Sequence, residues 1–116
     1  MEKLLHYIWK HRILPLSELR TTDGRSVEVI DPGLQNMHAG PDFFNAKVRI
    51  DGVMWVGNVE IHERSADWFL HGHDTDAAYN NVVLHVAAVV DADVVTARGA
   101  HLPQVPLQEP PQVLAN

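Results

Sequence analysis

The dipeptide Asp51–Gly52 is the feature of the chain that most restricts its fold. It joins two runs of strand-forming residues, FFNAKVRI at 43–50 and VMWVGNVEIH at 53–62. Asp-Gly between such runs is the strongest short-range signal for a β-hairpin, because both residues tolerate the positive φ angles of a tight turn. The sequence therefore predicts an antiparallel pair of strands in the middle of the chain.

Three further patterns surround this hairpin. Apolar residues spaced as on one side of a helix predict a helix over 2–12, and SVEVI at 26–30 alternates as a strand does. The run VVLHVAAVV at 82–90 is almost wholly apolar, which is typical of an interior strand buried on both faces. We predict an α/β (α+β) fold, a small mixed sheet of four to five strands with an N-terminal helix packed on it.

The length of 116 residues suits a single domain. Prolines gather after residue 102, in PQVPLQEPPQ, and such a segment is typically extended. We predict one α/β domain over 1–102 and a proline-rich extended tail or linker over 103–116. A chain that ends in this way is expected to be a fragment of a longer protein.

Composition excludes several classes of protein. Hydrophobic residues make up 46% and charged residues 21%, which is ordinary for a globular domain. There is no apolar run of the ~20 residues that a membrane helix needs, and the charged N-terminus lacks the apolar stretch of a signal peptide. With no cysteine, disulfides and thiolate chemistry are excluded. We expect a cytoplasmic protein that does not act in a membrane.

The net charge of −6 bears on partners. Residues 1–58 hold seven Lys and Arg against seven Asp and Glu, whereas residues 59–116 hold two against eight. Proteins that bind nucleic acid usually show a basic stripe, because phosphate contacts dominate their affinity. We therefore expect nucleic acid as a partner only through a longer protein, and an unpaired sheet edge as a route to a homodimer.

The register of the hairpin decides whether two carboxylates meet. A two-residue turn pairs Ile50 with Val53 and leaves Asp42 opposite Ile61, whereas a three-residue turn sets Asp42 opposite Glu60. Packing alone allows either register. We predict the second on a functional premise, because opposed carboxylates repel each other unless a cation lies between them.

In that register Glu60, His62 and Asn58 share one face of their strand with Asp42 close by. Carboxylate oxygens are the ligands that Mg²⁺ and Mn²⁺ prefer, and such an ion activates a bound water. We predict Asp42 and Glu60 as metal ligands and His62 as the base or water-orienting group, which makes these three the predicted catalytic residues. The alternative is structural, with Asp42 capping a turn and the other two facing solvent.

A second polar cluster follows in DWFLHGHDTD. If this segment folds back over the hairpin, His71 and His73 join His62 in a site of the kind that binds Zn²⁺; otherwise it is a solvated loop. Asn36 and His38 lie in the glycine-containing loop before the hairpin and are candidate supporting groups. His85, within an apolar strand, is interpreted as a buried histidine whose hydrogen bonds are satisfied.

Two resemblances add to these inferences. The segments DPGLQNMHAGPDFFNAKVRIDG, WVGNVEIH, HGHD and YNNVVLHV resemble the N-terminal part of a bacterial family known as domain of unknown function 2851, which implies no activity. The order of helix, strand, Pro-Asp strand and Glu-x-His strand also resembles the PD-(D/E)XK nuclease superfamily. That resemblance implies that Asp42 and Glu60 bind metal, and that His62 replaces the usual lysine.

Two functions follow as hypotheses. The first is a divergent metal-dependent nuclease or phosphodiesterase, a hydrolase that uses Mg²⁺ or Mn²⁺ at Asp42 and Glu60. The second is a non-enzymatic binding or interaction domain whose polar residues serve structure. Zinc bound by His62, His71 and His73 is a further alternative.

Overall fold

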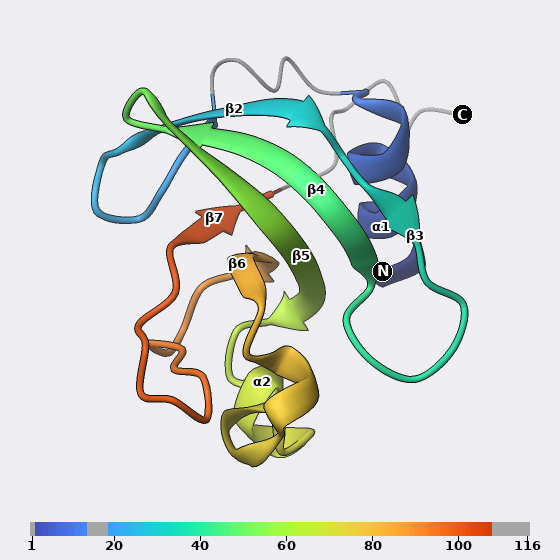
Figure 1. The fold of residues 1–116 in the computed structure, drawn as a ribbon, viewed down its shortest axis with the longest axis vertical. Helices are drawn as coiled ribbons and strands as arrows, with labels where there is room; N and C mark the ends of the chain where they lie inside the picture. The colour runs from blue at the N-terminus through green and yellow to red at the C-terminus, as the bar shows by residue number, and fades with distance from the viewer. Residues whose placement is uncertain (1, 14–18, 108–116) are drawn as a thin grey trace.

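A computed structural model describes residues 2–13 and 19–107 (Figure 1). Along the chain it contains α1 (Glu2–His11), β1 (Leu19–Arg20), β2 (Ser26–Asp31), β3 (Leu34–Gln35), β4 (Phe43–Ile50), β5 (Val53–Arg64), α2 (Asp67–Leu70), η2 (His73–Thr75), η3 (Ala77–Tyr79), β6 (Val82–Val89) and β7 (Gln104–Pro106). The predicted mixed α+β class with an N-terminal helix is confirmed. Within these two ranges, no helix has the length and apolar character needed to cross a bilayer.

One mixed sheet contains the seven strands of the described residues. Its order is β1-β2-β4-β5-β6-β7, with β3 also paired to β4, and β6 runs parallel to both β5 and β7. The sheet curves until its ends meet, so that the Thr22 N–H donates to the Gln104 carbonyl oxygen at 3.0 Å. The prediction of four to five strands is wrong, because β1, β3 and β7 have only two or three residues each, too few to form an alternating pattern.

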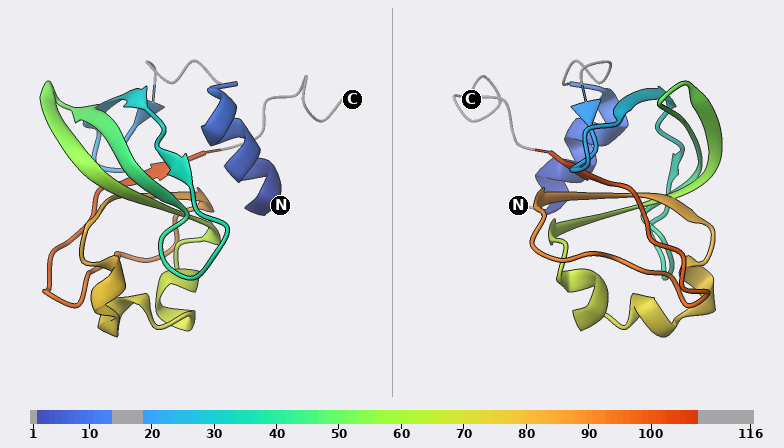
Figure 2. Two further views of the ribbon diagram at one scale, coloured as in Figure 1. Left: turned by 45° about the vertical axis from the view of Figure 1, so that its right-hand side comes forward. Right: turned by 90° about the vertical axis from the view of Figure 1, so that its left-hand side faces the viewer.

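Helix α1 covers one face of the sheet and closes the main core (Figure 2). Leu5, Ile8 and Trp9 are fully buried on its inner side, and Trp9 Nε1 donates to the Pro32 carbonyl oxygen at 3.0 Å. The strands complete this core with apolar side chains, which are Val27, Val48, Ile50, Val59, Ile61, Leu84, Val86 and Val105. The helical spacing of apolar residues thus identified the buried side of α1 correctly.

The segment from α2 to η3 lies on the opposite side of β5 and β6 (Figure 2). Trp68 and Tyr79 form a second, smaller core there with Val82 and Val94. Trp68 Nε1 donates to the Val95 carbonyl oxygen at 2.8 Å. This hydrogen bond joins the segment from α2 to η3 to the connection between β6 and β7. Strand β6 is therefore covered on both faces and lies between two other strands, as its apolar sequence predicts.

The hairpin turn contains two residues, not the predicted three. Asp51 and Gly52 have φ angles of 49° and 82°, the positive values of the tight turn that Asp-Gly favours. Ile50 consequently pairs with Val53, and this register continues to the pair of Ala46 and Gly57. The prediction of a three-residue turn is wrong, because Asp51 and Gly52 both adopt positive φ angles and close the tighter two-residue turn.

A β-bulge nevertheless restores the predicted meeting of carboxylates. Asn45 has a φ of 58° and is left out of the pairing, so the register shifts by one residue and Phe43 pairs with Val59. Its N–H donates to the Asn58 side-chain oxygen at 3.3 Å. Beyond the bulge, the Asp42 N–H donates to Glu60 Oε1 at 3.1 Å. The two acidic residues are therefore neighbours, for a reason that the alternation of the strands did not reveal.

The segment 103–116, predicted to be an extended tail or linker, begins inside the fold. Residues 104–106 form β7, and Val105 and Leu107 are almost completely buried in the main core. The packed part of the chain thus continues beyond residue 102. The rest of the predicted tail, 108–116, lies outside the described residues.

Candidate metal centre

A row of polar side chains is buried on the face of the sheet that α2 and η2 cover. Alternation along the strands places on this face one pair from β5 and one residue each from β6 and β7. Glu60 pairs with His85 across the parallel strands, and His85 pairs with Gln104. All have relative exposures of 4% or less, and they are Glu60, His62, His85 and Gln104. Buried polar groups need partners, so their contacts are informative.

Hydrogen bonds in this row fix the positions of protons. Gln104 Nε2 donates to the Ala92 carbonyl oxygen at 2.7 Å, so Gln104 Oε1 is the atom that accepts from His85 Nδ1 at 2.9 Å. Burial lowers the pKa of His85 to about 4, which keeps its ring neutral and leaves a lone pair on Nε2. That lone pair accepts from His62 Nδ1 at 2.8 Å. His62 Nδ1 therefore carries a proton, and its Nε2 faces Glu60. We call the side chains of Gln104, His85 and His62 the histidine relay.

Glu60 lies at the end of the histidine relay. Its Oε2 is 3.1 Å from His62 Nε2 and 2.9 Å from His73 Nε2. Burial raises the pKa of Glu60, but the His62 and His73 rings beside it lower it by more, to about 2. The side chain is thus an ionised carboxylate, held below the surface between imidazoles on one side and the Asp42 backbone on the other.

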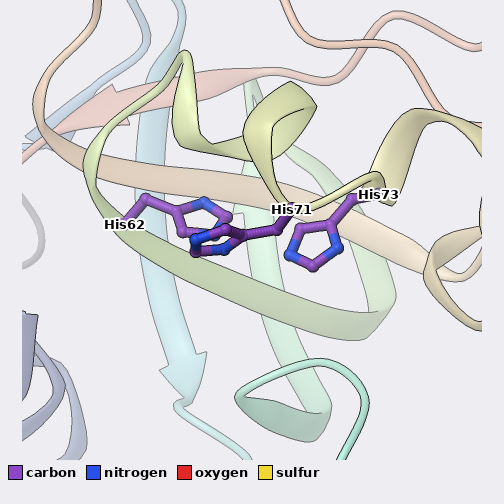
Figure 3. A group of neighbouring side chains, drawn as sticks. All are labelled: His62, His71 and His73. Carbon is purple, nitrogen blue, oxygen red and sulfur yellow. The ribbon is translucent and has the colours of Figure 1, made fainter.

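Two histidines from the segment between α2 and η2 lie beside His62. His71 follows α2, and His73 begins η2 after a left-handed Gly72 with φ of 72°, a conformation that glycine adopts readily. Their ring nitrogens and those of His62 include one ligand atom each, all within 4.8 Å of one another (Figure 3). We call His62, His71 and His73 the histidine group.

In the histidine group, aromatic side chains pack against His73, whereas His71 is exposed to solvent. The His73 ring stacks on Tyr79, with centroids 3.7 Å apart, and meets the edge of Trp68 at 5.2 Å. His62 and His73 are buried, whereas His71 is exposed. Both ring nitrogens of His73 are buried without a hydrogen-bond partner, despite the close approach of Glu60. Solvent can therefore reach the histidine group on the side of His71.

A second set of ligand atoms lies on the α1 side of the same region. Glu2 and His6 from α1 and Asp42 before β4 offer one ligand atom each, again within 4.8 Å of one another. His6 Nε2 is 3.4 Å from Asp42 Oδ2, which also accepts from the Ile61 N–H at 2.8 Å. Burial raises the pKa of both Glu2 and Asp42, and the Asp42 carboxylate raises the pKa of His6. We call these three residues the helix group.

A cavity of about 630 Å³ opens beside the helix group. Glu2 and His6 line it together with Lys3 and Lys10 from α1, and Asn36 and His38 line its other side. Asn36 mainly shapes the loop, since its Nδ2 donates to the carbonyl oxygens of Ala39 and Pro41 at 3.0 Å. The cavity volume is in the range that holds small ligands.

The structure thus brings together most of the residues singled out in the sequence. Asp42, Glu60 and His62 are adjacent, and His71 and His73 do fold back onto them. Asn58 contacts the bulge through its side-chain oxygen, and Asn36 and His38 border the cavity. The interpretation of His85 as a buried and satisfied histidine is confirmed by its two hydrogen bonds.

Sequence reasoning missed Glu2, His6 and Gln104. The first two are four residues apart on a helix and therefore share a face, which is a signal that could have been noted. Nothing local connects that face with Asp42, because the contact between α1 and the start of β4 is tertiary. Gln104 was assigned to the tail, so no role in a buried relay was foreseen.

Fold and site together define a small α+β domain that buries carboxylates and histidines on a curved sheet. Comparison with protein families places the chain more narrowly. It belongs to the family described as protein of unknown function DUF2851, which it matches over residues 2–116. No curated protein and no solved structure matches it. The order α1, β2, β4, β5 agrees with the order that prompted the PD-(D/E)XK resemblance, which stays a prediction.

Proposed function

We propose that this domain is a metal-dependent hydrolase whose centre is a Zn²⁺ ion held by His62, His71 and His73. The observation that carries the proposal is the state of His73, whose Nδ1 is buried with no hydrogen-bond partner while its Nε2 lies 2.9 Å from Glu60 Oε2. Burying a polar atom without a partner costs about 1–3 kcal/mol, and a bound cation would remove that cost at the liganding nitrogen. Imidazole is a preferred ligand of Zn²⁺ and of similar transition metals.

The histidine relay supports the same assignment. A histidine that binds a metal through one nitrogen almost always donates the other N–H to a fixed acceptor, which sets its tautomer and orientation. His62 has this arrangement, because its Nδ1 faces the neutral His85 at 2.8 Å and leaves Nε2, 3.1 Å from Glu60 Oε2, as the nitrogen that would bind the ion. Gln104 and the Ala92 carbonyl oxygen continue the support behind His85.

An open position and a nearby carboxylate favour catalysis over a purely structural ion. Catalytic zinc sites keep three protein ligands and one exchangeable position, and the exposure of His71 gives the site contact with solvent. Zinc supplies a bound water with a pKa near 7. Glu60, an ionised carboxylate next to His62 and His73, would accept a hydrogen bond from such a water and hold it in position.

A second candidate is the Mg²⁺ or Mn²⁺ site at Asp42 and Glu60 that the sequence predicts, with His62 as base. The observation that favours it is the bulge at Asn45, which makes the two acidic residues neighbours. Against it as the main metal site, it gives no role to His71 or to the unpartnered Nδ1 of His73.

Calorimetric titration with Zn²⁺ and separately with Mn²⁺ separates these candidates, using tag-free wild type, His73→Ala, Asp42→Ala and His101→Ala. Loss of a residue that only supports a metal ligand lowers metal affinity by about 10–100-fold. We expect the Zn²⁺ affinity of His73→Ala to fall by more than this, because His73 is a ligand in the proposed centre. The exposed His101 provides the matched control, whose removal should change nothing.

The other outcomes decide against the zinc centre. Manganese binding that depends on Asp42 but is indifferent to His73 would favour the second candidate. A folded protein that binds neither ion would refute both and leave the non-enzymatic binding domain.

Hydrolysis of a chromogenic phosphodiester by the zinc-loaded wild type, absent in Glu60→Gln, would establish the reaction class.

A further inference from the structure

The helix group places two partly buried carboxylates beside one imidazole. Glu2 and His6 project from the same side of α1 towards Asp42, and the three ligand atoms lie within 4.8 Å of one another. His6 Nε2 is buried and has no hydrogen-bond partner, although Asp42 Oδ2 is 3.4 Å away. Like charges brought this close favour a cation between them, and two carboxylates with one imidazole form a donor set that divalent metals accept.

Glu60 connects the helix group with the histidine group. Its Oε1 is turned towards Asp42, whose N–H it accepts at 3.1 Å, while its Oε2 is turned towards His62 and His73. In enzymes with two metal ions, the ions lie about 3.5–4 Å apart and share ligands that lie between them. A carboxylate with one oxygen towards each set of ligands is suited to that position.

The charge balance points the same way. Three carboxylates, Glu2, Asp42 and Glu60, lie in one partly or wholly buried region. An isolated buried charge costs several kcal/mol, so such a group needs compensating positive charge. One divalent ion would not balance three carboxylates, whereas two divalent ions would exceed them by one unit and leave a centre that attracts an anion.

We propose that Glu2, His6 and Asp42 bind a second divalent cation, and that Glu60 bridges it to the ion of the histidine group in a binuclear centre. This inference rests on the proposed zinc centre and extends it. The cavity beside the helix group provides the approach for substrate, since Glu2 and His6 line it. Lys3 and Lys10 on the same wall favour an anionic substrate such as a phosphate ester.

The number of metal ions per chain tests the proposal. Tag-free protein is loaded with Zn²⁺, freed of excess metal and analysed for metal by mass spectrometry. We expect two ions in wild type, one in His6→Ala, and two in His101→Ala, a control at an exposed histidine outside the lining of this cavity. Glu2→Gln, which keeps the size of the side chain, should also retain only one, and circular dichroism verifies that each variant is folded.

Each alternative count has a distinct meaning. One ion in wild type that is lost in His73→Ala but kept in His6→Ala would overturn the binuclear centre and leave the proposed function intact. One ion that is lost in His6→Ala but kept in His73→Ala would overturn the zinc centre of the histidine group, and the binuclear centre with it. No bound ion would overturn both.

A second readout addresses the bridge itself. In protein loaded with Mn²⁺, two ions that share Glu60 should give an exchange-coupled electron paramagnetic resonance spectrum. Glu60→Gln weakens the bridge, so it should convert that spectrum to one of isolated ions or lose an ion. Uncoupled spectra from a wild type that holds two ions would contradict the bridging role of Glu60.

Discussion

The two faces of the β5–β6 pair are equally buried but chemically opposite. The face towards α1 carries Val59, Ile61, Leu84 and Val86, and the face towards α2 carries Glu60, His62 and His85. All seven are less than 5% exposed. Burial alone therefore says little about what a residue does in this fold. The chemistry of each face decides whether burial stabilises the protein or costs free energy that other interactions must offset.

On the apolar face, each fully buried side chain contributes about 1.5–3 kcal/mol through removal of apolar surface from water. On the polar face, the histidine relay satisfies His85 and Gln104, but His73 Nδ1 is buried without a hydrogen-bond partner. The polar face is therefore the less stable half of the structure without a ligand. Four substitutions test this difference, from the largest expected effect to the smallest.

Leu84→Ala should be the most damaging of the four. It leaves a cavity in the main core, where Leu84 is fully buried, and should lower the free energy of unfolding by about 2–5 kcal/mol. Urea denaturation of metal-free protein measures this loss. Zinc affinity of the folded variant should be unchanged, because Leu84 faces away from the histidine group. A loss below about 1 kcal/mol would mean that the apolar face is not the main source of stability.

His85→Ala tests the polar face at the neighbouring position of the same strand. It leaves Gln104 Oε1 and His62 Nδ1 without their partners, and should cost about 1–3 kcal/mol in metal-free protein. Zinc affinity should fall by about 10–100-fold, because His62 loses its orientation. Val86→Ala is the matched control, with lower stability and unaltered zinc affinity. An unchanged zinc affinity in His85→Ala would show that the histidine relay does not support a metal ligand.

Asn45→Val tests the bulge that aligns Asp42 with Glu60. A β-branched residue is poorly suited to the φ of 58° at this position, so the free energy of unfolding should fall by about 1–2 kcal/mol. Asn45→Gly should tolerate the bulge and fold as wild type does. Chemical denaturation of both variants makes the comparison. Equal stability of the two would indicate that the strand can pair without the bulge.

Asp91→Asn should have the smallest effect, and one that depends on pH. Hydrogen bonds from the Ala66 N–H and the Ser65 hydroxyl lower the pKa of Asp91 below its ordinary 3.8. A carboxylate whose pKa is lower in the folded state stabilises at neutral pH, and this contribution disappears as the pH falls through the folded value.

The melting temperatures of wild type and Asp91→Asn should therefore differ at about pH 6, and the difference should shrink progressively as the pH is lowered below the ordinary 3.8. The exposed Asp93, changed to Asn, serves as control. A difference in melting temperature that persists unchanged in acid would mean that Asp91 stabilises the start of α2 without its charge.

The elements that sequence patterns predicted well are those with local causes. The spacing of Leu5, Ile8 and Trp9 identified α1 and its buried side, and Asp51–Gly52 identified the hairpin. The bulge was not predictable by alternation, because it depends on one residue, Asn45, taking a positive φ within a strand. A strand count from patterns also fails for strands of two or three residues, which only pairing defines.

The candidate site was predictable in part for the same reason. Glu60 and His62 share a face because alternation requires it, and the spacing of His71 and His73 suggested a joint site once the segment folds back. The proximity of Glu2 and His6 to Asp42, and of Gln104 to His85, depends on how α1 and β7 pack, which no local pattern encodes. Long-range packing therefore supplied these three residues of the site.

The parallel pairing of β5 with β6 has a consequence for the order of events in folding. Parallel neighbours cannot be joined by a tight turn, and here residues 65–81 must pass over the sheet before the two strands can pair. Pairing between strands distant in sequence forms slowly, so the polar face is completed late. An ion that binds only the completed face cannot speed the slow step. It should instead lengthen the lifetime of the folded chain by slowing its opening.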